Sequence, residues 1–184
     1  NYGDFSDIID LINYSKKLNY YSESFHYFYE KYNDQFQMYY SKNNRPLGLE
    51  VVYNPEILNE PVIQKWIDVF KDFGLNFNHD TSMPGSGQTG FQLVRTNLVD
   101  SPAGVTPHRD RFRTAGLVFP LTFPQRIQWY ENDKVVYDHQ YTKLTFINAG
   151  GHVHGVEYSP DPRWQFQFDI HVDWETIPGL LEKI

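Results

Sequence analysis

The sequence predicts an α+β fold in which a mainly helical first part supports a β-rich second part. Apolar residues recur at helical spacing in two segments before residue 75, whereas short runs typical of strands follow from Phe91 onward. Short strands at such regular spacing are typical of a sandwich or barrel. We therefore expect a body of β-sheet, with the N-terminal helices packed on the outer face of one sheet.

Residues 1–75 are expected to be mainly helical. Apolar residues three and four positions apart define one amphipathic helix over residues 5–13 and another over residues 62–73. Pro61 lies near the start of the second helix and Gly74 just past its end, where these residue types are favoured. Both helices offer an apolar face against which a sheet can pack.

Two further segments precede the expected sheet. The aromatic segment 24–40 is compatible with a helix or a strand. Residues 80–90, rich in Gly, Ser, Thr and Pro, form either a lid over a site or an ordinary surface connection. The strands are then expected at residues 91–98, 115–121, 126–130, 134–137, 143–147 and 163–172.

The last expected strand has two distinct faces. Polar and apolar residues alternate along it, so each face meets different surroundings. In a barrel the apolar face would pack against the helices, while Arg163 and Gln165 lined the cavity; otherwise Arg163 would lie on an ordinary solvent-facing strand. We favour the first arrangement. The apolar face carries Trp164, Phe166, Phe168, Ile170 and Val172, and the polar face Arg163, Gln165, Gln167, Asp169 and His171.

Composition restricts the class of protein. A chain of 184 residues can bury a genuine core, and we expect residues 1–184 to form one domain. A net charge of −7 argues against nucleic acid as a partner. Because Cys is absent, there are no disulfides or thiolate metal sites. No apolar run approaches the ~18 residues that span a bilayer, and no signal-peptide pattern is evident. We expect no membrane partner and a cytoplasmic location.

His108-Arg109-Asp110 and the later His154 form a candidate metal-binding set. On a strand, His108 and Asp110 would share a face about 6.6 Å apart and could converge on one ion. Two histidines and a carboxylate can occupy one face of an octahedral metal, the ligand set of non-haem Fe(II) oxygenases. The triplet alone is also compatible with a surface loop. A second His-x-Asp triplet begins at His171, but no histidine follows it.

Three histidines are candidates for the distal ligand. His139 lies in a polar stretch expected to be a surface turn, whereas His152 and His154 share one side of an extended segment. His154 is favoured because a proline-bracketed turn at residues 158–162 folds the chain back to Arg163, nine positions further on. His154 and Arg163 would then face each other across two adjacent strands, and His152 would be a buried or supporting imidazole.

A basic strip, Arg109, Arg111 and Arg113, accompanies the first metal motif. Its simplest interpretation, which we favour, is a solvated loop. The functional alternative is contact with an acidic substrate.

The segment from Asn148 to Ile170 resembles the distal-histidine and arginine region of the 2-oxoglutarate/Fe(II)-dependent dioxygenases. It reads NAGGHVHGVEYSPDPRWQFQFDI, and the run PHRD around His108 resembles the first metal motif of that family. The prolyl-hydroxylase-like branch is the most similar, and the resemblance covers about residues 91–172. One departure is that many relatives carry a tyrosine on the strand before this motif, where the chain reads LVRTN at residues 93–97. The group that holds the second carboxylate of the cosubstrate therefore stays open.

The resemblance implies a double-stranded β-helix, which is a jelly-roll, cupin-like barrel, with residues 91–172 as its core. It implies that Fe(II) is bound at the catalytic centre by His108, Asp110 and His154. Arg163 would bind the distal carboxylate of 2-oxoglutarate, and O2 would be consumed in a hydroxylation that releases succinate and CO2. Thr145 and Gln165 would line the cosubstrate pocket or be structural. Neither the ligands nor the strand pattern selects a primary substrate or an oligomeric state.

Two other classes of protein fit the same residues. A cupin-like metalloenzyme would bind a metal through them without 2-oxoglutarate, and Arg163 would then be incidental. A jelly-roll module that binds carbohydrate or protein, or is structural, would carry these histidines by coincidence.

Overall fold

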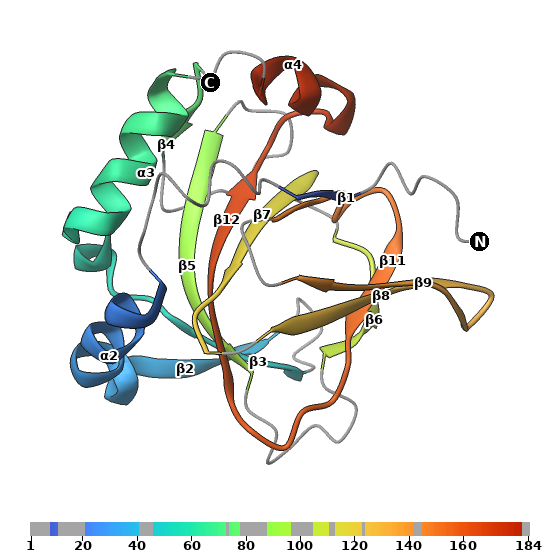
Figure 1. The fold of residues 1–184 in the computed structure, drawn as a ribbon, viewed down its shortest axis with the longest axis horizontal. Coiled ribbons are helices and arrows are strands. Elements are labelled where there is room, and N and C mark those ends of the chain that lie inside the picture. Colours follow the sequence, from blue (N-terminus) through green and yellow to red (C-terminus); the bar gives the residue numbers. More distant parts are fainter. Residues whose placement is uncertain are drawn as a thin grey trace.

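Two β-sheets face each other as a sandwich, and short helices lie outside it (Figure 1). The structure is a computed structural model that describes residues 8–10, 21–40, 46–72, 74–77, 88–96, 105–110, 113–122, 124–141 and 145–181. Within these residues the strands pair antiparallel, apart from one short parallel pair at residues 76–77.

The larger sheet has eight strands and is built around its longest antiparallel pairings. Across the sheet the order is β1 (Ile8–Asp10), β10 (Thr145–Ile147), β7 (Ala115–Pro120), β12 (Arg163–Ile170), β5 (Gln88–Thr96), β3 (Pro46–Val52) and β2 (Phe36–Tyr40), with β4 (Asn76–Phe77) also on β5. β12 pairs with β5 along its whole length and with β7 from Gln165 to Ile170. This central strand is therefore held on both sides.

The smaller sheet has four strands, in the order β6 (Val105–His108), β11 (Val153–Val156), β8 (Gln125–Glu131) and β9 (Lys134–Tyr141). A tight hairpin joins β8 to β9. Asn132 and Asp133 at its tip have φ angles of 49° and 62°, the left-handed conformation that two-residue hairpin turns require. β11 lies between β6 and β8, so its residues are fixed from both edges.

Helices cover the outer face of the larger sheet (Figure 1). Phe166 of β12 packs against Phe28 at 5.0 Å between ring centroids, and Phe168 packs against Trp66 at 5.3 Å and Phe70 at 5.1 Å. Burying these aromatic rings is the main apolar contact between helices and sheet. The helices on this face are α2 (Tyr21–Tyr32) and α3 (Pro61–Asp72), whereas α4 (Ile177–Leu181) lies beyond the ends of β5 and β12 (Figure 1). Short 3-10 turns are found at Asn33–Gln35, Pro55–Asn59 and Trp174–Thr176.

The inner face of β12 is polar and looks toward the smaller sheet. Gln165 accepts a hydrogen bond from the Tyr141 hydroxyl at 2.9 Å, and the Gln167 amide donates to Asp169 at 3.2 Å. A second, smaller apolar cluster joins the two sheets. It consists of Val118, Ile127, Trp129, Tyr141, Ile147 and Ala149. The alternation seen in the sequence of β12 thus separates an aromatic core from a polar interior.

Several sequence-based predictions are confirmed. The second predicted helix is α3, and apolar residues of β12 do face the helices. The segment 24–40 contains both a helix, α2, and a strand, β2. The six predicted strands correspond to β5, β7, β8, β9, β10 and β12.

Other predictions are wrong. Within the predicted helix 5–13, the described residues Ile8–Asp10 form β1 because they pair with β10, a non-local contact that outweighs helical periodicity. Two strands of the first part, β2 and β3, also join the larger sheet, which the sequence had not suggested. Residues 88–90 of the predicted loop begin β5, and residues 80–87 lie outside the described residues.

Phe168→Ala tests the contact between β12 and the helices. Phe168 is fully buried among aromatic rings, so its truncation should lower the free energy of unfolding by about 3–5 kcal/mol. Urea denaturation followed by circular dichroism measures the change. Tyr158→Ala, at a residue that is 49% exposed, is the control and should change stability by less than about 0.5 kcal/mol. Equal small effects would contradict the packing described above.

Candidate functional site

Three residues of the smaller sheet and its edge converge to form a candidate metal site. His108 ends β6, Asp110 follows two residues later, and His154 lies on β11 directly opposite His108. The two imidazole rings are 4.7 Å apart between centroids, and Nε2 of His108 is 3.2 Å from Oδ1 of Asp110. One potential ligand atom from each residue lies within 4.8 Å of the others. The structure therefore brings together the His-Asp-His set selected from the sequence.

Local backbone contacts hold this arrangement. The Asp110 amide donates to the Ala149 carbonyl at 3.1 Å, which ties the residues after β6 to the turn before β11. Gly155 lets β11 approach β6 closely, because a Cβ there would lie 2.9 Å from the Val105 carbonyl oxygen. Any side chain at this position would push the two strands apart. The close approach of the two strands thus explains why a glycine follows the distal histidine.

Both imidazoles are oriented by backbone carbonyls. Nδ1 of His108 is 2.7 Å from the Thr106 carbonyl, and Nδ1 of His154 is 3.1 Å from the His152 carbonyl. A carbonyl only accepts hydrogen bonds, so each Nδ1 is placed to carry the proton and each Nε2 to offer its lone pair. This is the usual way in which a protein fixes the tautomer of a metal-binding histidine.

The charges of the three residues suit a divalent cation. Burial lowers the pKa of His154 to about 4, so this imidazole is neutral at neutral pH. Burial would raise the pKa of Asp110, but Arg113 and His108 outweigh it and hold that pKa well below its usual range. For His108, burial lowers the pKa while Asp110 raises it more, and the net shift is upward. An ionised carboxylate and a neutral imidazole are the forms that bind metals, and a metal would displace the proton of His108.

Arg113 is buried beside this cluster. Its Nε donates to Oδ2 of Asp110 at 2.7 Å and its Nη1 to Oδ1 of Asp169 at 2.9 Å, and its side chain is only 13% exposed. The prediction of a solvated basic strip is therefore wrong for Arg113, because carboxylates from two segments enclose it. Arg109 is exposed as expected, and Arg111 lies outside the described residues.

The predicted cosubstrate residues lie on strands of the larger sheet. Arg163 begins β12 and is only 2% exposed; its Nη2 donates to the Glu157 carbonyl, and its Nε has no partner among the described residues. Gln165 follows on the same face of β12. Thr145 is fully buried on β10, on the same side as Ile147 of the inner apolar cluster.

The sequence had suggested that His154 and Arg163 lie on adjacent strands, but this prediction is wrong. β11 belongs to the smaller sheet and β12 to the larger one, so the two residues approach from opposite layers of the sandwich. The reason is that the proline-bracketed segment 158–162 crosses between the sheets rather than forming a hairpin within one.

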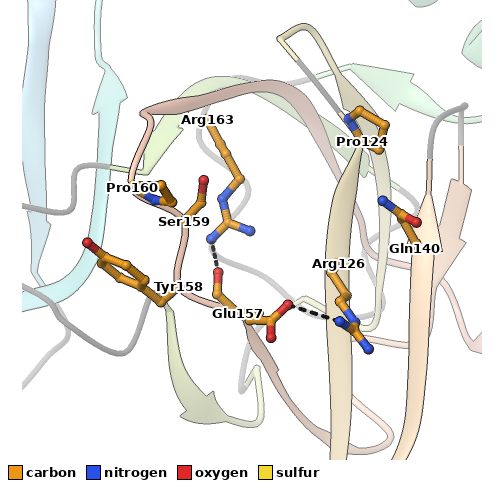
Figure 2. Close-up of a pocket in the computed structure, with 8 residues that line it drawn as sticks. All are labelled: Pro124, Arg126, Gln140, Glu157, Tyr158, Ser159, Pro160 and Arg163. Atoms are coloured by element: carbon orange, nitrogen blue, oxygen red, sulfur yellow. Dashed lines mark hydrogen bonds and ion pairs between the residues drawn. The ribbon is translucent and has the colours of Figure 1, made fainter.

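A pocket of about 250 Å³ lies beside Arg163 (Figure 2). In Figure 2 the Arg163 side chain reaches down from β12 toward the Glu157 carbonyl, while the Glu157 carboxylate faces Arg126 at 3.4 Å. The pocket therefore carries two guanidinium groups. Its lining residues are Pro124, Arg126, Gln140, Glu157, Tyr158, Ser159, Pro160 and Arg163.

The other two histidine candidates lie outside the cluster. His139 belongs to β9 and stacks on Tyr137 with ring centroids 6.3 Å apart, so its placement in a surface turn is wrong. His152 is partly buried, and its Nε2 lies 3.8 Å from Glu131 Oε1. Its contribution to the cluster comes from its backbone carbonyl, which contacts His154.

Sequence reasoning missed Asp169 and Tyr39 as neighbours of the site. In the sequence, Asp169 is one of the alternating polar positions of the last strand and carries no other signal. Tyr39 comes from β2, where burial and then the charges of Asp169 and Asp110 raise its pKa. Asp169 reaches the site through the pairing of β12 with β7, and the β2–β3 hairpin that carries Tyr39 joins the sheet through the pairing of β3 with β5. These pairings are distant in sequence, so no local pattern could have revealed either residue.

The comparisons with known proteins locate the fold. The sequence matches no family model and no curated protein. The structure is similar to that of a full-length Neurospora crassa protein in complex with alpha-KG and 5-formyluracil, with 15% identity, 89% of this chain and 73% of that chain covered, and a TM-score of 0.50. It is also similar to a prolyl-4-hydroxylase of Pseudomonas putida, with 11% identity, coverage of 80% and 84%, and a TM-score of 0.49. The chain thus shares its fold with the Neurospora crassa protein that was solved with alpha-KG.

Among the described residues, no helix combines the length and apolar character needed to cross a membrane.

Replacing His152 and His154 one at a time shows which of the two imidazoles binds the metal. His154→Ala should abolish binding of Co(II), used as a redox-stable probe, because it removes a buried imidazole of the cluster. His152→Ala should weaken binding only modestly, since its side chain faces Glu131 and its carbonyl remains. Isothermal titration calorimetry gives both affinities. The reverse order of effects would show that the wrong histidine has been chosen.

Proposed function

We propose that this chain is a non-haem Fe(II)- and 2-oxoglutarate-dependent oxygenase that hydroxylates its substrate. The observation that carries the proposal is the convergence of His108, Asp110 and His154, with both Nδ1 atoms held by carbonyls. Such a set binds one face of a metal and leaves three positions for other ligands. The similarity to the Neurospora crassa protein, which was solved with alpha-KG, is consistent with this use of the fold.

The fold that we propose is the double-stranded β-helix, a jelly-roll barrel. The order of strands supports it, because successive strands from β5 to β12 alternate between the sheets apart from the β8–β9 hairpin. The four central strands of the larger sheet run β10-β7-β12-β5, opposite β6-β11-β8-β9. We further propose that residues 1–184 are one domain whose strands from residue 91 to 172 carry the metal site.

The roles of the metal-site residues follow from their charges. His154 is neutral and buried, Asp110 is ionised, and His108 contributes Nε2 once its proton is displaced. Together they would hold Fe(II), which with 2-oxoglutarate and O2 supplies oxidative decarboxylation to succinate and CO2 coupled to hydroxylation. The protein positions the groups and excludes water around them.

Arg163 is proposed to bind the distal carboxylate of 2-oxoglutarate. Its Nε is buried without a partner among the described residues, and burial lowers its pKa, so a carboxylate there would satisfy both the open donor and the charge. The planar guanidinium can form two parallel hydrogen bonds to a carboxylate. Gln165 and Thr145 are proposed as walls of the same interior.

One observation favours the second candidate, a cupin-like metalloenzyme without 2-oxoglutarate. The Arg163 guanidinium already donates to the Glu157 carbonyl and lines the pocket shown in Figure 2, whose eight lining residues do not include the His-Asp-His set. Arg163 would then support the loop before β12 rather than bind a cosubstrate.

Anaerobic addition of Fe(II) and 2-oxoglutarate separates the two candidates. Chelation of Fe(II) by 2-oxoglutarate should give a metal-to-ligand charge-transfer band in the visible spectrum, and titration of that band gives the affinity. Fe(II) binding without the band would favour the cupin-like enzyme. Absence of metal binding by the folded protein would leave only a binding or structural module.

Arg163→Leu tests the carboxylate role. Fe(II) affinity should stay unchanged, while the 2-oxoglutarate concentration at half-saturation of the band should rise about 10–100-fold, the equivalent of about 1.5–3 kcal/mol for charged hydrogen bonds. Arg126→Leu is the matched control, because Arg126 lines the same pocket but is exposed and paired with Asp138. If Arg126→Leu raised the half-saturating 2-oxoglutarate concentration as much as Arg163→Leu, a specific role of Arg163 would be contradicted.

A further inference from the structure

Arg113 connects the candidate ligand Asp110 to a second carboxylate, Asp169 of β12. Nε and Nη2 of Arg113 lie 2.7 and 2.5 Å from Oδ2 of Asp110, while Nη1 lies 2.9 Å from Oδ1 of Asp169. The three side chains are 13%, 18% and 16% exposed respectively. The guanidinium is thus enclosed between the edge of the metal site and the centre of the larger sheet.

These contacts make the two oxygens of Asp110 different. Oδ2 receives two donors from Arg113, whereas Oδ1 faces Nε2 of His108 at 3.2 Å. An oxygen that accepts two charged hydrogen bonds is a poor metal ligand, because its lone pairs are used. Oδ1 is the atom left for an ion that also contacts the histidines.

Asp169 and the glycine opposite it hold Arg113 in place. A guanidinium beside a divalent cation is repelled, and the negative charge of Asp169 offsets this repulsion within a buried environment. Gly116 pairs with Asp169 in the β7–β12 register, and a Cβ on Gly116 would lie 3.2 Å from Nη1 of Arg113. The missing side chain leaves the space through which Arg113 reaches Asp169.

We propose that Arg113 is a positioning residue of the metal site, which occupies Oδ2 of Asp110 so that this carboxylate binds the ion through Oδ1 alone. The inference rests on the proposed function. A carboxylate bound through one oxygen uses one coordination position and keeps three open for the cosubstrate and O2. Binding through both oxygens would close one of the three. Asp169 and Gly116 act through Arg113.

Co(II) titration of the full chain tests the role without turnover. Arg113→Gln should weaken Co(II) binding about 10–100-fold, as changes in groups that orient metal ligands usually do. It should also change the visible absorption of bound Co(II), whose intensity reports coordination number. Arg95→Gln is the matched control: it removes another partly buried arginine–carboxylate pair of the larger sheet, Arg95 with Glu50 at 2.7 Å, and should change neither readout.

Two further variants distinguish positioning from general support. Asp169→Asn should weaken Co(II) binding less than Arg113→Gln, and the double variant should be no worse than Arg113→Gln, because Asp169 acts through Arg113. Gly116→Ala keeps every charge, displaces Arg113, and should cause a smaller loss in the same direction. This variant decides the question if Arg113→Gln fails to fold.

The outcomes separate the two proposals. If the parent protein binds no Co(II), both the proposed function and the role of Arg113 fail. If the parent binds Co(II) but folded Arg113→Gln, or in its place Gly116→Ala, keeps the same affinity and spectrum, the positioning role alone is overturned. Additive losses in the Arg113 and Asp169 double variant would also overturn it, because the two residues would then act independently.

Discussion

The candidate site depends on the pairing of β6 with β11, which places His154 directly opposite His108. Two histidines 46 positions apart in the sequence become neighbours only through this register. Since side chains alternate between the faces of a strand, a slip of one residue would turn His154 to the other side. The close approach at Gly155 and the hydrogen bond from Asp110 to Ala149 resist such a slip.

The second determinant is the division of β12 into two faces. Its aromatic face anchors the strand on α2 and α3, and this anchoring fixes the polar face toward the smaller sheet. The positions of Arg163, Gln165 and Asp169 along the inner face are therefore fixed by the register of β12 with its neighbours. The aromatic contacts on the outer face of the same strand hold that register in place. Asp169 forms an ion pair with Arg113, which lies beside the candidate metal site. The packing of helices on the outer face of β12 thus contributes to the placement of this arginine.

Local patterns in the sequence predicted the elements whose character is local. The amphipathic spacing of α3 and the strict alternation of β12 are properties of single segments, so both were predictable. β1 was wrongly predicted as a helix because its extended conformation comes from pairing with β10. The prediction that His154 and Arg163 lie on adjacent strands is wrong for a similar reason. A turn rich in proline does not reveal whether the strands it connects belong to the same sheet.

The candidate site divides in the same way. The order and spacing of His108, Asp110, His154 and Arg163 are visible in the sequence, and they led to the ligand set. The burial of Arg113 is not visible, because its partner Asp169 is 56 positions away and the contact depends on the register between β7 and β12. Charged residues next to a loop are usually solvated, and only the fold shows that this arginine is enclosed.

The central claim is that one metal ion binds between β6 and β11. The most direct measurement is X-ray diffraction at the iron absorption edge from crystals grown anaerobically with Fe(II). We expect a single anomalous peak in contact with Nε2 of His108, Nε2 of His154 and Oδ1 of Asp110. A peak bound by other residues, or no peak in crystals of the folded protein, would contradict the claim.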